Sequence, residues 1–205
     1  MKIKKTNKYL YLISPNQIKK NFYRDLNEVF KSQKVKFFQL RLKNYTFEKK
    51  LNIGRKVNKI CKKYGIYFLV NDDPHLALKI NADGCHLGQK DMLITNARKI
   101  LKNRIIGITC HNSKKLIKEA VLNKADYIAI GAFYKSRTKK LKFKADLNLL
   151  KWTVKNYDIP IVAIGGINSS NYKKLLLHNA NFLAISSFVW SNKLFKPRDT
   201  LRFFK

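Results

Sequence analysis

Eight short apolar runs, each separated from the next by a longer, lysine-rich segment, constrain the fold of this chain more than any other feature. Several runs are apolar at consecutive positions, which is typical of strands covered on both faces. The alternation continues without a linker and therefore predicts one α/β domain, residues 1–205, whose parallel sheet closes into a compact (β/α)8 TIM barrel. The alternative is an open doubly wound sheet, but no GxGxxG motif follows the first run. The runs lie at residues 8–14, 35–42, 66–71, 82–88, 105–110, 125–133, 159–166 and 181–188.

The segments between the runs have helical spacing. Residues 46–65 place apolar side chains on one face, and Gly65 is typical of a residue that ends a helix. We expect Asn112 or Ser113 to cap a second helix, and the sequence NSSN at 168–171 to cap a third. The segment between the third and fourth runs is short, so its helix should be brief. The apolar residues of the first helix are Phe47, Leu51, Val57, Ile60 and Cys61.

The charge of the chain raises the question of nucleic-acid binding. Its 205 residues are 45% hydrophobic, which suffices for a buried core, and the formal net charge is +32. Of the 44 basic residues only eight are Arg, the residue best suited to bidentate contacts with bases and phosphates, and the lysines are spread along the whole chain. We therefore favour a solvated lysine surface, with weak polyanion binding at low salt, over a specific nucleic-acid partner.

The N-terminal and cysteine patterns favour a cytoplasmic enzyme or binding protein. The apolar stretch from Tyr9 to Ile13 is too short for a signal peptide, and no run reaches the roughly 18–20 apolar residues of a membrane span. Cys61, Cys85 and Cys110 lie far apart and form no CxxC motif, which favours reduced thiols. The sequence leaves a homo-oligomer open.

Three polar residues end the second run, where a barrel of this kind places its active site. Gln39, Arg41 and Lys43 are spaced two apart, so in an extended strand all three can face the same way. The alternative is a surface strand end with solvated charges. It is less favoured because Arg41 continues an apolar run.

Acidic residues follow the next two runs. Asn71, Asp72 and Asp73 end the third run, and Asp91 comes soon after the fourth. Together with the cations, hydroxyls and glycines at other strand ends, they indicate a site for phosphate or pyrophosphate with Mg²⁺ held by two carboxylates. An alternative role for Asp72 and Asp73 is to cap the helix that begins at Pro74; we expect Asp73 to cap and Asp72 to face the barrel mouth.

A glycine-rich turn and a pair of serines end the last two runs. The sequence IGGINSSN includes Gly166 at the end of the seventh run, and Ser186 and Ser187 lie near the end of the eighth. In barrels of this type, backbone N–H groups and helix N-termini at this position bind phosphate. We expect a phosphate site here.

Histidines and cysteines are less informative. Cys85 and His86 are neighbours, as are Cys110 and His111, so along a strand each pair points to opposite faces and cannot act as nucleophile and base. A zinc cluster of His86, Cys110 and His111 is geometrically feasible but disfavoured.

These motifs, in this order, resemble those of the thiamine phosphate synthase family. The resemblance extends from about residue 35 to residue 189. It implies a transferase of thiamine biosynthesis that joins an aminomethylpyrimidine diphosphate to a thiazole phosphate and releases pyrophosphate. The motifs stand here as QLRLK, VNDD, ADGCHLGQKD, GITCH, ADYIAIGAFYKSRTKK and VAIGGI.

The resemblance also implies residue roles. Asp72 and Asp91 would bind Mg²⁺, and Arg41, Lys43 and Lys139 would be catalytic. The implied mechanism is dissociative: pyrophosphate leaves, a pyrimidine-stabilised carbocation forms, and the thiazole nitrogen attacks it. The residues implied to hold the pyrimidine diphosphate are Gln39, Arg41, Lys43, Asn71, Thr109 and Lys139, and those for the thiazole phosphate are Ser136, Thr138, Gly166, Ser186 and Ser187.

Three positions depart from the family pattern. Asp73 stands where the family usually has Arg, the Thr-Pro-Thr loop reads Ser136-Arg137-Thr138, and Phe188 follows the serines in place of a small residue. Two other functions stay open at this point. One is a thiazole tautomerase-like isomerase, which needs no diphosphate or Mg²⁺ site, and the other is a non-catalytic basic barrel that binds nucleic acid.

Overall fold

The computed structural model describes residues 9–135 and 143–205, in which strands and helices alternate along the chain. The strands are β1 (Leu10–Ile13), β2 (Val35–Leu40), β3 (Tyr67–Asn71), β4 (Gly84–Leu87), β5 (Ile105–His111), β6 (Tyr127–Gly131), β7 (Ile161–Ile164) and β8 (Phe182–Ile185). The helices are α1 (Phe22–Lys31), α2 (Phe47–Lys63), α3 (Pro74–Lys79), α4 (Ile94–Leu101), α5 (Lys114–Leu122), α6 (Leu147–Asn156), α7 (Tyr172–Leu177), α8 (Ser187–Trp190) and α9 (Pro197–Thr200), followed by the 3-10 helix η1 (Leu201–Phe203).

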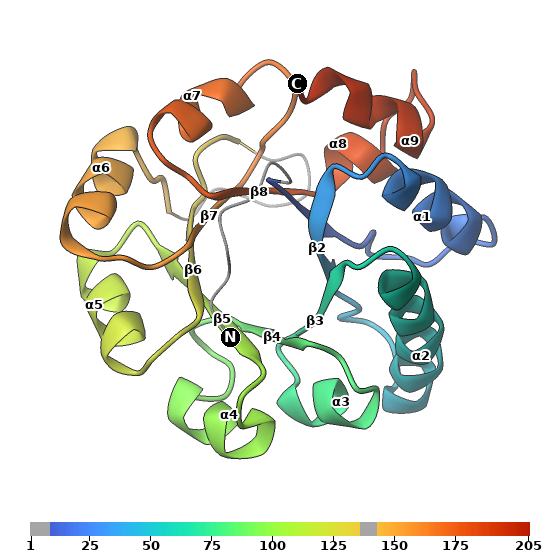
Figure 1. Ribbon diagram of the computed structural model, residues 1–205, viewed down its shortest axis with the longest axis horizontal. Helices are drawn as coiled ribbons and strands as arrows, with labels where there is room; N and C mark the ends of the chain where they lie inside the picture. The colour runs from blue at the N-terminus through green and yellow to red at the C-terminus, as the bar shows by residue number, and fades with distance from the viewer. Residues whose placement is uncertain (1–8, 136–142) are drawn as a thin grey trace.

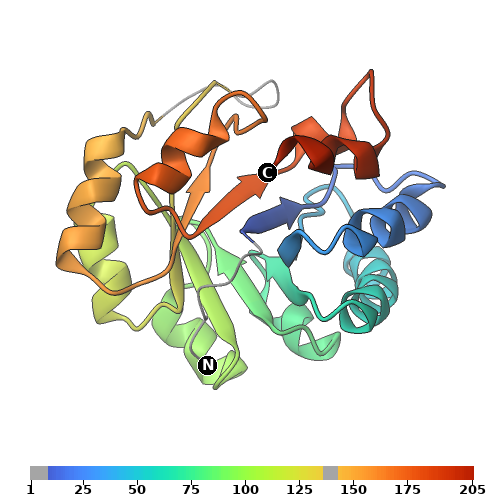
Figure 2. The same cartoon turned by 45° about the horizontal axis from the view of Figure 1, so that its top comes forward.

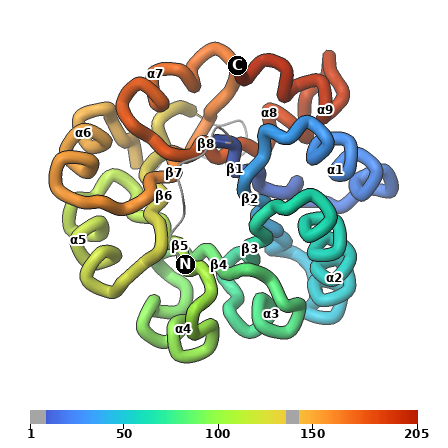
Figure 3. Tube along the Cα trace, viewed as in Figure 1, coloured from blue at the N-terminus to red at the C-terminus, as the bar shows by residue number. Residues whose placement is uncertain are grey.

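The eight strands pair in sequence order and close into a barrel, with β1 hydrogen-bonded to β8. The helices form a ring around the strands (Figures 1 and 3). The predicted (β/α)8 barrel is therefore confirmed, and the open doubly wound alternative is wrong. Each strand lies within the apolar run predicted for it, except that β5 extends one residue further, to His111.

All strand pairs are parallel, so the carboxyl ends of the strands meet at one end of the barrel (Figure 2). We call this end the mouth. Residues that follow different strands and lie far apart in the sequence therefore come together there.

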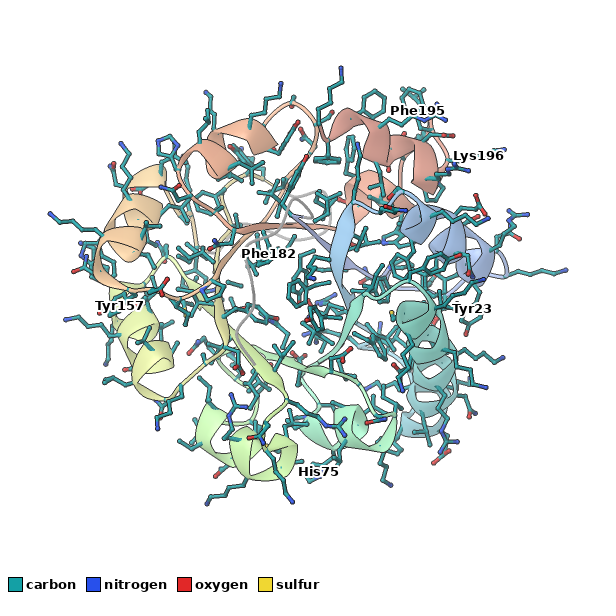
Figure 4. All side chains as sticks on the ribbon, viewed as in Figure 1. Tyr23, His75, Tyr157, Phe182, Phe195 and Lys196 are labelled. Carbon is teal, nitrogen blue, oxygen red and sulfur yellow. The ribbon has the colours of Figure 1, made fainter. Side chains whose placement is uncertain are left out.

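The strands are covered on both faces, as their apolar runs predict. An inner core fills the barrel and includes Tyr11, Phe37, Tyr127 and Phe182, and Figure 4 shows Phe182 inside the ring of strands. The neighbouring residues along each strand, such as Phe38, belong to an outer core that packs the strands against the helices. This alternation explains why each run has few polar positions.

Gly107 of β5 leaves room for one of the inner-core rings. A Cβ at Gly107 would lie 1.9 Å from Cζ of Tyr127. The ring of Tyr127 can therefore cross this point only because residue 107 has no side chain.

Two helix predictions are confirmed and two are corrected. Gly65 follows α2 with φ +62°, and Ser113 caps α5 by accepting a hydrogen bond from Leu116 N at 3.3 Å. Phe47 was expected on the buried face of α2, but it is 38% exposed and lies beneath the Lys79 ammonium. Asn171 precedes α7 without capping it, because its side chain instead holds the preceding loop.

Cys61, Cys85 and Cys110 are free and buried. Of the helices in the described part of the chain, none is long and apolar enough to cross a membrane.

Asp73 caps α3, as predicted, by accepting a hydrogen bond from Leu76 N at 2.9 Å. We expect Asp73→Ala to lower the free energy of unfolding by about 1 kcal/mol, because the first turn of α3 loses this partner. Chemical denaturation measures the change. Asp146→Ala is the matched control, since Asp146 caps α6 through Leu149 N at the same distance, 2.9 Å. A loss in the control without a loss at Asp73 would contradict the capping role.

Candidate active site

The predicted residues of β2 and β3 meet at the mouth. Gln39 is only 3% exposed, and its Nε2 donates a hydrogen bond to Asn71 Oδ1 at 2.5 Å. Beyond the end of β2, Lys43 Nζ lies 3.6 Å from Asp72 Oδ2. The structure therefore brings the amide pair and the ion pair of these two strands to the same place.

Arg41 is held by the end of β1. Its backbone N donates to Ser14 Oγ at 2.9 Å, and its Nη1 donates to Asn16 Oδ1 at 3.1 Å. Burial lowers the pKa of Arg41, and the nearby Asp72 carboxylate acts in the opposite direction. Arg41 and Lys43 thus place two positive charges beside Asp72.

Asp72 and Asp91 form a carboxyl pair, although they follow different strands. Burial first, and then a hydrogen bond and charge repulsion from Asp91, raise the pKa of Asp72 to about 6 against the opposing effect of Lys43 and Arg41. Asp72 has φ +66°, and its N–H donates to His86 O at 2.8 Å. Asp91 Oδ2 accepts a hydrogen bond from Gly88 N at 2.7 Å. The backbone of Asp72 and the carboxyl group of Asp91 are therefore each held by a hydrogen bond to the backbone of another residue.

This pair fits a hard divalent cation. Two carboxylates that repel each other are stabilised by a cation between them, and Mg²⁺ typically takes one or two protein carboxylates and completes its shell with water and substrate phosphate oxygens. Within residues 9–135 and 143–205, no group of three or more His, Cys, Asp or Glu side chains could form a metal cage. The conceivable zinc cluster is not assembled there either, because the Cys110 side chain packs in the outer core.

A pocket of about 400 Å³ opens beside the carboxyl pair. It lies against α3, where Figure 4 shows His75 outside the ring of strands. The pocket brings Lys43 and Asp72 together with residues from α2 and α3. Its lining consists of Leu40, Leu42, Lys43, Lys50, Val70, Asn71, Asp72, Asp73, Pro74, His75, Leu76 and Met92.

Tyr11, Tyr127 and His86 connect the predicted residues through the barrel interior; sequence reasoning missed the two tyrosines and weighed His86 only as a disfavoured zinc ligand. Thr109 Oγ1 lies 2.8 Å from His86 Nε2, and His86 Nδ1 lies 2.7 Å from the Tyr127 hydroxyl. The Tyr127 and Tyr11 hydroxyls are 2.8 Å apart, and Tyr11 donates to Gln39 Oε1 at 3.1 Å. Polar-tipped aromatic residues at inward positions of apolar strands are the signal that points to such a chain.

The side chains of Tyr11, Tyr127 and His86 are uncharged at physiological pH. Burial lowers the pKa of His86 to about 4, and it raises the pKa of both Tyr11 and Tyr127 above the ordinary tyrosine value. His86 therefore donates through one ring nitrogen and accepts through the other.

The loops after β7 and β8 carry part of the predicted phosphate site. Gly166 has φ +61°, and a Cβ there would lie 2.4 Å from Lys135 O, so this turn requires glycine. Asn171 Nδ2 donates to Gly166 O at 3.0 Å. Ser186 Oγ donates to Ser14 O at 3.2 Å, and Ser187 begins α8. Gly166, Ser186 and Ser187 thus follow adjacent strands of the mouth.

The remaining predicted residues have different outcomes. Ser136, Thr138 and Lys139 lie outside the described residues. Phe188, the departure from a small residue, packs its ring against Phe204 with centroids 5.5 Å apart. Its bulk is therefore accommodated by the C-terminal segment.

Comparisons of the sequence with known proteins indicate one family. The sequence profile of the family described as thiamine monophosphate synthase matches residues 10–189. A thiamine-phosphate synthase of Pelagibacter ubique (strain HTCC1062) is 59% identical over 98% of this chain and 99% of that protein. A thiamine-phosphate synthase of Erythrobacter litoralis (strain HTCC2594) is 40% identical over 89% of this chain and 88% of its own length. The solved structure of a thiamine phosphate pyrophosphorylase from Pyrococcus furiosus has a TM-score of 0.85 and 28% identity, and the match covers 96% of this chain and 93% of that one.

We expect Asp72→Asn to stabilise the metal-free protein at high pH. The pKa of Asp72 is about 6 in the folded chain, above the ordinary value of 3.8, so its charged form opposes folding. The free energy of unfolding therefore falls as pH rises from about 4 to about 6, and the loss persists above that range. The uncharged Asn avoids it, so the variant should be more stable by about 2 kcal/mol at pH 8, allowing for partial exposure, and by under about 0.5 kcal/mol at pH 4.

Urea denaturation in EDTA at both pH values provides the measurement. Asp158→Asn is the control, because Asp158 lies just before β7, at the end of the barrel opposite the mouth. Equal gains at pH 4 and pH 8 would contradict a carboxyl pair whose charge opposes folding.

Proposed function

The chain belongs to the thiamine monophosphate synthase family and is a transferase, and we propose that it couples an aminomethylpyrimidine diphosphate to a thiazole phosphate to give thiamine phosphate and pyrophosphate. The observation that carries this proposal is the pairing of Asp72 with Asp91 beside Lys43 and Arg41. Two acids and two cations at one strand edge suit a magnesium-bound diphosphate. A tautomerase would need neither.

The diphosphate end of the first substrate would lie against Arg41 and Lys43. Asp72 and Asp91 would hold Mg²⁺, which when bound supplies charge neutralisation to the diphosphate oxygens. Arg41 would offer a planar set of donors and Lys43 a point charge to the oxygens on which charge accumulates as pyrophosphate departs. Lys139 would add a third cation.

The pyrimidine ring would lie deeper in the mouth, between Gln39, Asn71 and Thr109. Departure of pyrophosphate leaves a carbocation stabilised by the pyrimidine, and the thiazole nitrogen then attacks it. This route needs no protein nucleophile. It is consistent with the state of the cysteines on β4 and β5, since burial raises the pKa of both Cys85 and Cys110 and keeps them as thiols.

The thiazole phosphate would bind on the opposite side of the mouth. Gly166 and the serines Ser186 and Ser187 offer backbone N–H groups and hydroxyls there, and Ser136 and Thr138 would complete the set. Small phosphorylated molecules in the cytoplasm would be the partners, and the lysine surface would bind polyanions only weakly, without a specific nucleic-acid partner.

We expect Asp72→Asn and Asp91→Asn each to reduce turnover at least about 100-fold, because each removes a negative charge that would hold Mg²⁺ against the departing diphosphate. Purified protein is incubated with both phosphorylated precursors and Mg²⁺, and the product is oxidised and measured as fluorescent thiochrome. Asp73→Asn is the matched control. Its carboxylate caps α3, so turnover should stay within about threefold.

Two further readings decide the assignment. EDTA should abolish product formation in the parent protein, and Mn²⁺ binding followed by electron paramagnetic resonance should weaken in both pair variants but not in Asp73→Asn. Parent-like turnover in either Asp72→Asn or Asp91→Asn would contradict the proposal that these residues bind Mg²⁺. Absence of product from the folded parent protein with added Mg²⁺ would instead favour the tautomerase.

A further inference from the structure

A continuous hydrogen-bonded chain crosses the interior of the barrel and ends at two residues of the mouth. In order, its members are Asn71, Gln39, Tyr11, Tyr127, His86 and Thr109. His86 pairs in register with Asn71 of β3, while β4 also pairs with β5, the strand that carries Thr109. The two ends of the chain therefore lie on either side of the same strand. The inference below rests on the proposed function.

The direction of each hydrogen bond follows from the first one. Gln39 donates through Nε2 to Asn71 Oδ1, so its Oε1 accepts from Tyr11. Tyr11 has a single hydroxyl hydrogen, and this bond uses it. In the contact between the tyrosines, Tyr127 must therefore donate and Tyr11 must accept.

Counting the hydrogens in the same way fixes the remaining two hydrogen bonds, as far as Thr109. Tyr127 has used its hydrogen on Tyr11, so at the contact with His86 its oxygen accepts from Nδ1–H. His86 is buried between the Tyr127 and Thr109 hydroxyls, an environment that favours the uncharged ring, so its Nε2 carries no hydrogen and accepts from the Thr109 hydroxyl. The hydroxyl of Thr109 is left with lone pairs only.

The ends of the chain therefore have opposite character. Asn71 Oδ1 is occupied by Gln39, which leaves the Nδ2 hydrogens as donors. Thr109 offers an acceptor. A ligand that satisfies both ends has an N–H donor next to an acceptor nitrogen, as an amino group beside a ring nitrogen does.

We propose that Tyr11, Tyr127 and His86 are positioning residues that fix this polarity and so select an aminopyrimidine over its oxo counterpart. In a 4-oxopyrimidine the exocyclic group accepts and the ring N–H donates, which reverses the pattern and leaves both ends of the chain mismatched. Tyr11 and Tyr127 are each 1% exposed and His86 is 8% exposed, so the chain is shielded from exchange with solvent.

The first test needs no substrate. Nitrogen-15 NMR of the histidine-labelled parent protein at pH 7 should show His86 as the Nδ1–H tautomer, with the signal assigned by its loss in His86→Gln. In Tyr127→Phe the acceptor for Nδ1–H is gone, so the signal should move toward the Nε2–H tautomer. Tyr67→Phe is the matched control: Tyr67 also packs on the inner core, stacked on Phe37, and should leave the tautomer unchanged.

The second test measures selectivity. The ratio of kcat/KM for the aminopyrimidine diphosphate to that for its 4-oxo analogue should fall about tenfold or more in Tyr127→Phe, because a freed His86 lets the Thr109 hydroxyl donate. The change should come mainly from the KM of the pyrimidine substrate. The KM of the thiazole phosphate and the selectivity of Tyr67→Phe should stay at parent values.

The outcomes separate this inference from the proposed function. An Nε2–H tautomer in the folded parent protein overturns the inference, whatever the enzyme does and whether or not Tyr127→Phe folds. Unchanged selectivity in a folded Tyr127→Phe also overturns it. Failure of the proposed function appears differently, as absent product from a parent protein whose His86 is in the Nδ1–H form.

Discussion

The seam at which β1 closes the barrel against β8 is the constraint on which the site depends. Leu10 and Leu12 pair with Leu183 and Ile185 across it. At its mouth end, the buried Ser14 donates from its backbone N to Gln39 O, accepts from Arg41 N and accepts from Ser186 Oγ. One residue therefore ties the expected diphosphate side of the mouth to the expected thiazole phosphate side. A sheet left open between β1 and β8 would lose this link.

Closure of the barrel also lets the buried polar side chains of its interior form hydrogen bonds with one another. Tyr11 on β1 and Tyr127 on β6 meet across the barrel only because the strands are wrapped around a common axis, and Gly107 leaves space for the Tyr127 ring. A buried hydroxyl or imidazole without a partner opposes folding by roughly 1–3 kcal/mol. When every member is satisfied, the same groups specify one arrangement of the core. The apolar part of the inner core and the polar chain thus support each other.

The sequence predicts the strands and the mouth better than the interior. Continuous apolar runs locate every strand, and the i, i+2 spacing of Gln39, Arg41 and Lys43 correctly predicts a shared edge with Asn71 and Asp72. The inward tyrosines were missed because a strand that is buried on both faces has no polar alternation to mark which residues face the barrel axis. Phe47 and Asn171 were misjudged because tertiary contacts, with Lys79 and with the loop at Gly166, override local helix preferences.

Asp73 shows how a third acid near the carboxyl pair can be accommodated. By itself, its charge would increase the repulsion between Asp72 and Asp91. Its carboxylate instead accepts from Leu76 N at the start of α3, where the helix dipole favours negative charge. Lys43 and Lys50 line the same pocket. Compensation has to be this local, because in physiological salt the remaining lysines, spread over the surface, are screened beyond about 8 Å.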